Sequence, residues 1–149
     1  MQAVEDAKVA TYDEISKNLV AIVKDNDNLE LQWEGEPGKS RLLVITWTNK
    51  SYYDDYVGKD YPLPEDANIW VTVAPELKNF VQEQSQDITA LRIEQLLGLP
   101  PESGKTKFIE MWVNPGDMFR PSPDPEITDH EAEIKFPTIL NIFLMFDNR

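Results

Sequence analysis

The chain has 149 residues, and its 27 acidic and 14 basic side chains give a formal net charge of −13 at pH 7. This charge repels phosphate backbones and anionic membrane surfaces, so nucleic acid is not an expected partner, whereas a basic protein, a cation or a neutral ligand is. Hydrophobic residues make up 41% of a sequence without cysteine, which indicates a globular chain and excludes disulfides and thiolate metal sites.

No membrane insertion is predicted, because no apolar run approaches the roughly 20 residues that a membrane helix needs. The start of the sequence has neither the basic nor the apolar region of a signal peptide. The chain is therefore predicted to be soluble. It is either cytosolic or a mature exported form, periplasmic or extracellular, without its signal peptide. The sequence indicates no particular oligomeric state.

A helix is predicted over residues 11–24. Thr11 and Glu14 have the spacing of a capping box, in which each side chain bonds to the backbone amide of the other residue. Apolar side chains then recur at the spacing of one helical face, up to a polar stop at residues 25–28. This apolar face consists of Tyr12, Ile15, Leu19, Ile22 and Val23.

A β-hairpin is predicted over residues 29–48. Apolar and polar side chains alternate over residues 29–34, as in a strand with one solvent-exposed face, and residues 41–47 are apolar almost throughout. The segment between them contains glycines and a proline, which are typical of a turn. We therefore expect an outer strand followed by a more central one.

A strand, two helices and a further strand are predicted over residues 69–113. The first strand covers residues 69–73, and Pro75 fits the first turn of the helix that follows. Gly98 suits the left-handed position after the second helix, and the last strand covers residues 108–113. This order allows the two strands to be parallel neighbours joined by a right-handed crossover.

Each predicted strand carries one tryptophan. Tryptophan in a strand usually packs in the core, so a packing role is expected for all of them. The alternative is an aromatic platform for sugars, as in an exported solute- or glycan-binding domain. The residues concerned are Trp33, Trp47, Trp70 and Trp112.

The segment 49–68 is a loop rich in tyrosine and aspartate, which holds four of the chain's five tyrosines. Tyrosine is rigid and has an apolar body with a polar tip, so such a cluster can bury area on a protein partner at little cost in entropy. The alternative is that the rings fold back over the sheet and the carboxylates only solvate the loop. The candidate partner-binding residues are Tyr52, Tyr53, Asp54, Asp55, Tyr56 and Tyr61.

The proline-rich acidic loop over residues 114–131 is the candidate metal site. Its prolines restrict the backbone, and its carboxylates with one histidine offer oxygen and nitrogen ligands for Ca²⁺ or another divalent metal. The alternative is a solvated acidic loop, and no cofactor is then expected. Arg120 is expected to close the loop through a bidentate pair with a carboxylate. The candidate ligands are Asp124, Glu126, Asp129 and His130.

An enzyme is not the favoured interpretation. His130 is the only imidazole, and the sequence has no Gly-x-Ser-x-Gly motif for a hydroxyl nucleophile. A metal-dependent or carboxylate hydrolase centred on residues 117–133 is the enzymatic alternative, because a pair of carboxylates acting as acid and base needs no particular motif.

Two runs in the second half of the chain resemble segments of a known family. They are Gln95-Leu96-Leu97-Gly98-Leu99-Pro100-Pro101 and Phe119-Arg120-Pro121-Ser122-Pro123-Asp124-Pro125-Glu126-Ile127. The family consists of small, exported bacterial proteins of unknown function. In it, cysteines stand where this chain has Ser122 and Ala132, and a longer C-terminal part follows. The resemblance implies export and supplies no activity, and with these departures neither a disulfide nor a complete domain carries over.

Residues 132–149 form an apolar C-terminal segment with the composition of one or two further strands or of a docked helix. We predict a single α+β domain over residues 1–149, with a largely antiparallel sheet of four to six strands. An N-terminal helix and a central helix pair cover one face of the sheet. The favoured function is a non-enzymatic acidic binding module, of the inhibitor, immunity or chaperone type, that recognises a protein partner.

Overall fold

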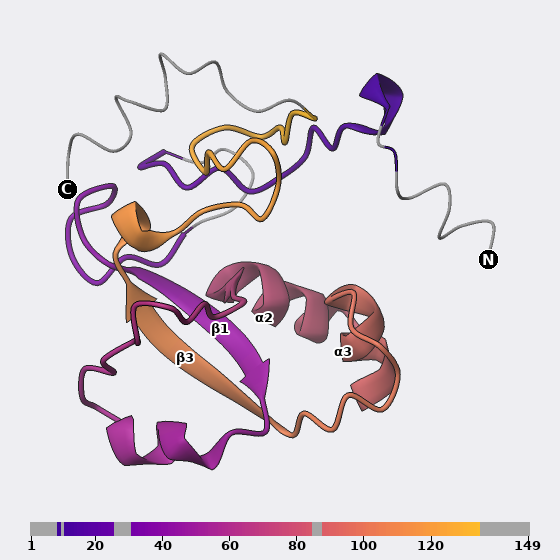
Figure 1. Ribbon diagram of the computed structural model, residues 1–149. Coiled ribbons are helices and arrows are strands. Elements are labelled where there is room, and N and C mark those ends of the chain that lie inside the picture. The colour runs from indigo at the N-terminus through magenta and orange to yellow at the C-terminus, as the bar shows by residue number, and fades with distance from the viewer. Residues whose placement is uncertain (1–8, 10, 26–30, 85–87, 135–149) are drawn as a thin grey trace. The chain divides into compact units, whose positions relative to one another are not determined.

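The computed structural model describes four stretches of the chain (Figure 1), namely residue 9 and residues 11–25, 31–84 and 88–134. These residues belong to two compact units, one over residues 1–28 and 115–149 and the other over residues 29–114. The prediction of a single domain over residues 1–149 stays a prediction. The expected C-terminal segment lies outside the described residues from residue 135 onward.

The second unit is built on one strand, β1 (Leu42–Thr48), which pairs on both edges with antiparallel neighbours. The sheet has the order β2-β1-β3, with β2 (Thr72–Val73) on one side and β3 (Lys107–Val113) on the other. Every residue of β1 is buried. A strand covered on both faces needs apolar side chains on both, which explains why this segment does not alternate.

The α+β class is confirmed, but the sheet is smaller than predicted. The described residues form three antiparallel strands instead of four to six. The outer strand of the hairpin shortens to one antiparallel bridge between Trp33 and Leu42, and the strand expected at residues 69–73 pairs only over Thr72–Val73. The arrangement of β2 and β3 as parallel neighbours is wrong, because β1 lies between them. An apolar, β-branched run shows that a segment favours a strand, but it does not show which segment will pair with it.

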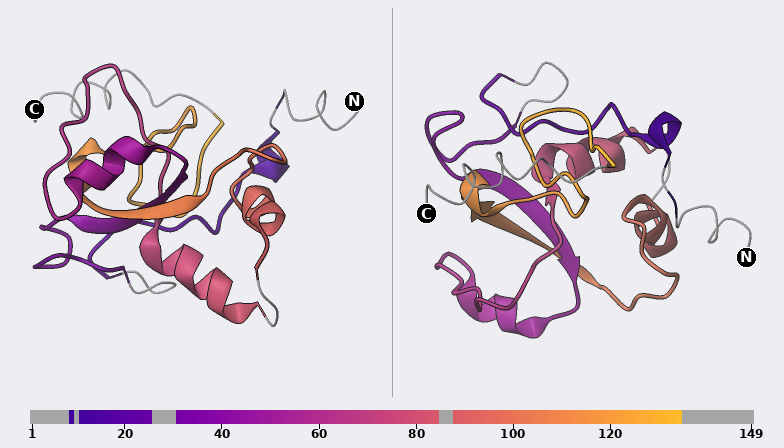
Figure 2. Two further views of the ribbon diagram at one scale, coloured as in Figure 1. Left: turned by 90° about the horizontal axis from the view of Figure 1, so that it is seen from below. Right: turned by 45° about the horizontal axis from the view of Figure 1, so that its top comes forward.

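Two helical segments cover opposite faces of this sheet (Figure 2): α2 (Ala74–Glu83) and the 3₁₀ helix η2 (Ser51–Tyr56). Pro75 lies in the first turn of α2, where its missing N–H would have had no helical partner. An ion pair between Lys78 and Glu110, at 2.6 Å, joins α2 to β3. The core cluster between α2 and β1 contains Leu43, Ile45, Ala74 and Leu77, with Val81 packed against it.

Helix α3 (Ala90–Leu96) ends as its sequence predicts, and a threonine caps its start. The side chain of Thr89 accepts a hydrogen bond from the amide of Arg92 at 3.2 Å, which caps the first turn. Gly98 follows the helix with φ 64°, and the amide of Leu99 donates to the carbonyl of Glu94 at 2.8 Å. This is the Schellman arrangement, in which a left-handed glycine lets the chain cap the last carbonyls.

The buried carboxylate of Glu94 fixes the turn that follows α3. It accepts hydrogen bonds from the amides of Glu102 and Ser103, at 3.1 and 2.7 Å. These bonds, with that from Ser103 the stronger, lower the pKa of Glu94, because they favour its charged form. Glu102 has a positive φ of 59°, so the carboxylate stabilises a turn that few side chains adopt alone.

We expect Glu94 to make folding stability depend on pH. Because its pKa is lowered in the folded state, its contribution is fully present above the ordinary carboxylate pKa and is lost as the pH falls through the folded-state value. The variant Glu94→Gln should be less stable at neutral pH and should lose less stability than the wild type on acidification. Thermal unfolding, followed from neutral pH down through the carboxylate pKa, measures both the stability at neutral pH and its loss in acid. Glu102→Gln is the control, because that side chain is exposed. Equal acid-side losses in the wild type and in Glu94→Gln would contradict this role.

The helix predicted over residues 11–24 is wrong. The described chain forms a single 3₁₀ turn here, η1 (Tyr12–Glu14), and Ile15 is already extended, with φ −60° and ψ 121°. The capping residues still act at the start of this turn, where the amide of Thr11 donates to the carboxylate of Glu14 at 2.7 Å. The capping box therefore predicted where the turn begins, but not that it would stop after one turn.

Contacts with the proline-rich loop replace the expected helical bonds. The amide of Leu19 donates to the carbonyl of His130 at 3.0 Å, and the amide of Ile22 donates to the carbonyl of Ile127 at 2.7 Å. These amides would otherwise have bonded within the helix. The first unit is thus built from paired loops, and residues 115–134 contain only the short 3₁₀ helix η3 (Pro115–Asp117). Across the described residues of both units, no helix is long and apolar enough to cross a membrane.

Candidate functional site

The predicted tyrosines form one cluster in the second unit. The rings of Tyr52, Tyr53, Tyr56 and Tyr61 contact one another, with centroid distances from 4.6 to 6.0 Å. Tyr53 is buried, whereas Tyr52 keeps 45% of its surface exposed. Burial, together with the neighbouring Tyr52, raises the pKa of the Tyr53 hydroxyl, which therefore stays protonated. The cluster thus has features of both interpretations of this segment. The rings pack on each other, as a structural role requires, and Tyr52 stays open to solvent, as a binding surface requires.

The two aspartates of η2 have different surroundings. Lys107 of β3 binds both carboxylate oxygens of Asp54, at 2.5 and 2.7 Å, and so joins η2 to the sheet. Asp55 is exposed, and its backbone carbonyl accepts a hydrogen bond from Lys59 at 3.0 Å. Within the described residues, no hydrogen bond or ion pair occupies the Asp55 carboxylate. Asp54 therefore has a structural role, and Asp55 is the carboxylate of η2 that is open to a partner.

The prediction that all four tryptophans pack in the core is wrong for two of them. Trp47 is buried and stacks on Phe108, with 5.8 Å between the ring centroids. Trp70 is 75% exposed because it precedes the first paired residue of β2, and Trp112 is 39% exposed because it lies on the edge strand β3. Position in the sheet, and not residue type, decides which tryptophan is covered.

Trp112 also lines an open hollow of about 680 Å³ in the second unit. Trp33 contributes a second indole, and Gln32 and Asn79 contribute amides. Pro75, in the first turn of α2, lies on its wall. Indole faces with amide donors and acceptors match the apolar faces and hydroxyls of a sugar.

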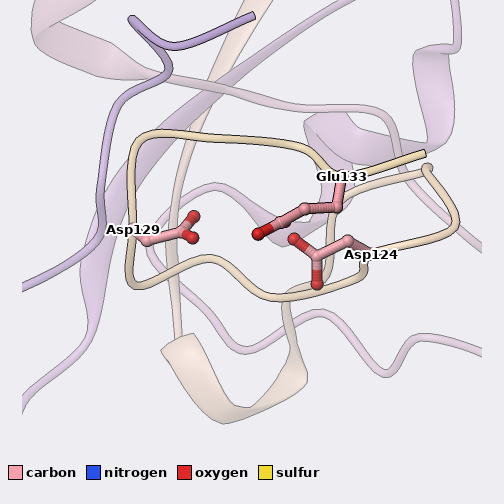
Figure 3. A group of neighbouring side chains, drawn as sticks. All are labelled: Asp124, Asp129 and Glu133. Atoms are coloured by element: carbon pink, nitrogen blue, oxygen red, sulfur yellow. The ribbon is translucent and has the colours of Figure 1, made fainter. Parts of the chain in front are cut away.

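In the first unit, two of the four predicted metal ligands come together. Oxygen atoms of Asp124, Asp129 and Glu133 all lie within 4.8 Å of one another, so this carboxylate cluster could hold a metal ion. Figure 3 shows the carboxylate of Glu133 reaching between those of the two aspartates. The other two predicted ligands are engaged elsewhere. Glu126 accepts a hydrogen bond from the hydroxyl of Thr128, and Nδ1 of His130 lies 2.7 Å from the carbonyl oxygen of Leu19.

Glu133 is the ligand that the predicted set lacks. It comes four residues after Asp129, just beyond the loop as predicted, and linear spacing does not show that the chain returns there to Asp124. The neighbouring carboxyl group of Asp124 raises the pKa of Glu133, and the charge of Asp129 raises it further.

Arg120 organises the same loop. Its guanidinium donates to the carboxylate and the carbonyl of Asp129, and to the carbonyl of Glu131 at 2.6 Å. It also reaches the carbonyl of Val20 at 3.4 Å, while its backbone amide donates to the carbonyl of Pro125 at 3.0 Å. The side chain is only 12% exposed. Arg120 therefore closes the loop on itself and fastens it to the N-terminal segment. It does so mainly through backbone carbonyls, and the expected bidentate pair is not formed, because only Oδ1 of Asp129 is contacted.

Comparisons of the chain with protein-family models, with curated proteins and with solved structures give no match. The resemblance to a family of exported bacterial proteins stays a hypothesis, and the function has to be argued from the geometry of the two clusters.

We expect Arg120→Lys to destabilise the chain by about 1–3 kcal/mol, because a lysine cannot donate to several carbonyls and a carboxylate at once and leaves some of them without a donor. Urea unfolding measures the free energy of unfolding. Arg92→Lys on the exposed surface of α3 is the matched control and should change stability by less than about 0.5 kcal/mol. Equal effects of the two substitutions would show that Arg120 does not hold the loop together.

Proposed function

We propose that the chain is a non-enzymatic acidic binding module that recognises a basic protein through residues 51–70. The observation that carries this proposal is the exposure of Tyr52 above rings that are packed on one another. Tyr53 and Tyr61 support the Tyr52 ring, so little side-chain entropy remains to be lost when a partner covers it. An exposed but supported aromatic ring is the usual form of a binding hot spot.

Charge around the tyrosines supports a basic partner. Residues 51–70 contain five carboxylates and one lysine. Asp55, Glu65 and Asp66 are exposed. Such a patch speeds the approach of a positively charged surface and repels an acidic one. Within the same segment, the exposed apolar side chains of Val57, Leu63 and Trp70 add surface that a partner can bury.

The tyrosine cluster also fits a protein better than a small molecule. Its rings pack against one another, and Asp54 is bound by Lys107, so η2 offers a firmly held surface. Inhibitors, immunity proteins and chaperones of small basic domains act through such surfaces without catalysis, which agrees with the absence of a catalytic motif from the sequence.

We expect Tyr52→Ala to weaken the complex by more than about 1 kcal/mol, because the substitution removes the exposed ring but leaves the buried Tyr53 in place. Affinity capture from an extract with the purified chain as bait should enrich a basic protein, and titration calorimetry then measures its dissociation constant for each variant. Tyr52→Phe is the matched control, since it keeps the ring. An affinity for Tyr52→Ala equal to that of the wild type would rule out this surface.

Asp55 tests the electrostatic part of the same proposal. Asp55→Asn should slow association and make it less sensitive to salt, because this carboxylate attracts the partner before contact. Glu36→Gln, an exposed change outside the segment, should have a smaller effect. Enrichment of acidic instead of basic proteins would contradict the proposed class of partner.

The hollow beside Trp112 favours a second candidate function, solute or glycan binding. If it binds sugars, a panel of mono- and oligosaccharides should quench or shift the tryptophan fluorescence, and Trp112→Phe should reduce the response. An unchanged spectrum across the panel would remove this candidate. The hydrolase centred on residues 117–133 stays a hypothesis, because the carboxylate cluster lies in this segment but His130 is not part of it and bonds to the carbonyl of Leu19.

A further inference from the structure

Three carboxylates of the first unit carry more negative charge than their described surroundings balance. Asp124, Asp129 and Glu133 lie together, and Arg120 is the base that contacts them, through Asp129. With all three ionised, the group keeps two uncompensated negative charges. Like charges at such distances repel strongly where water is partly excluded, so a positive ion or a proton is needed to keep them together.

Asp124 provides a second observation that points to a ligand. Its side chain is only 8% exposed. One carboxylate oxygen, Oδ1, accepts a weak hydrogen bond from the amide of Glu126 at 3.3 Å. The other, Oδ2, is buried and has no hydrogen-bond partner among the described residues. A buried carboxylate oxygen that accepts no hydrogen bond lowers the stability of the fold. Such atoms in folded proteins usually bind a water molecule or an ion.

We propose that Asp124, Asp129 and Glu133 form a binding site for one divalent cation, and that Ca²⁺ is the ion it prefers. Two oxygens that both contact a calcium ion at its usual bond length of about 2.3–2.6 Å can lie up to about 5 Å apart. One oxygen of each carboxylate lies within 4.8 Å of the other two, so every pair satisfies this limit. The charge of the ion equals the excess charge of the cluster with Arg120 included.

The ligand chemistry separates calcium from other common ions. All three ligands are carboxylate oxygens, which suits Ca²⁺, whereas Zn²⁺ prefers nitrogen or sulfur ligands and His130 is bonded to Leu19. Mg²⁺ requires a near-ideal octahedron, which an irregular loop rarely supplies, while Ca²⁺ accepts irregular geometry. Glu133 is exposed, so water can complete the coordination on its side and the ion can exchange with solvent.

The ion's role would be to cross-link the loop. Residues 115–134 have no helix or strand beyond η3, and the described part of this unit is held by Arg120 and by a few backbone bonds. A cation at the cluster would tie together three points of the loop, at residues 124, 129 and 133. This inference is independent of the proposed partner surface, which lies in the other unit.

Titration calorimetry of the full chain, stripped of metal with a chelator, tests the proposal directly. We expect saturable binding of one Ca²⁺ per chain and a rise in melting temperature, because an ion that binds only the folded state stabilises it. Mg²⁺ at the same concentration should bind more weakly. Sodium chloride at equal ionic strength controls for simple screening of the net charge.

Two variants locate the site. Glu133→Gln removes one ligand from an exposed position and should weaken Ca²⁺ binding by about tenfold or more, since ligand charge sets calcium affinity. Glu126→Gln, in the same loop but outside the cluster, should bind as the wild type does. Asp124→Asn should abolish binding, but Glu133→Gln decides the test because it leaves the buried residue intact. The proposal is overturned if no saturable binding occurs up to about 10 mM Ca²⁺, or if both glutamate variants bind equally.

Discussion

Pairing of β1 on both of its edges is the constraint on which the second unit depends. A strand that is buried along its whole length must have both faces covered, and here α2 packs on one face while η2 lies on the other. The ion pair between Lys107 of β3 and Asp54 then ties η2 to the sheet. The tyrosine cluster is thus tied to the sheet through η2, and its exposed ring is supported by the neighbouring rings.

Negative charge has a different effect in each unit. Along residues 51–70 the carboxylates are spread over an exposed surface, where they act at a distance and cost little stability. In the first unit three carboxylates come together, where they repel each other and where burial of Asp124 leaves one of them little access to water. The first arrangement suits a large basic partner and the second suits a small cation. We therefore propose two kinds of recognition for one acidic composition.

Local chemistry explains which features were predictable from the sequence. The end of α3 at Gly98 and the start of α2 at Pro75 depend on backbone preferences of single residues, and both were predicted correctly. The helix over residues 11–24 failed because Leu19 and Ile22 bond to the distant carbonyls of His130 and Ile127, which an apolar repeat cannot reveal.

The candidate sites also divide into features that local sequence predicts and features that depend on distant contacts. Arg120 is the only strong base among the acids of its loop, so an ion pair there could be expected from composition alone. The convergence of Glu133 on Asp124 could not, because it depends on where the chain turns back. Likewise, nothing in the spacing of Tyr52 and Tyr53 distinguishes the exposed ring from the buried one.

The most direct test of the proposed partner surface is hydrogen–deuterium exchange of the chain, alone and with its captured basic partner. We expect slower exchange in the partner complex over residues 51–70, and slowing confined to other parts of the chain would contradict the proposed surface.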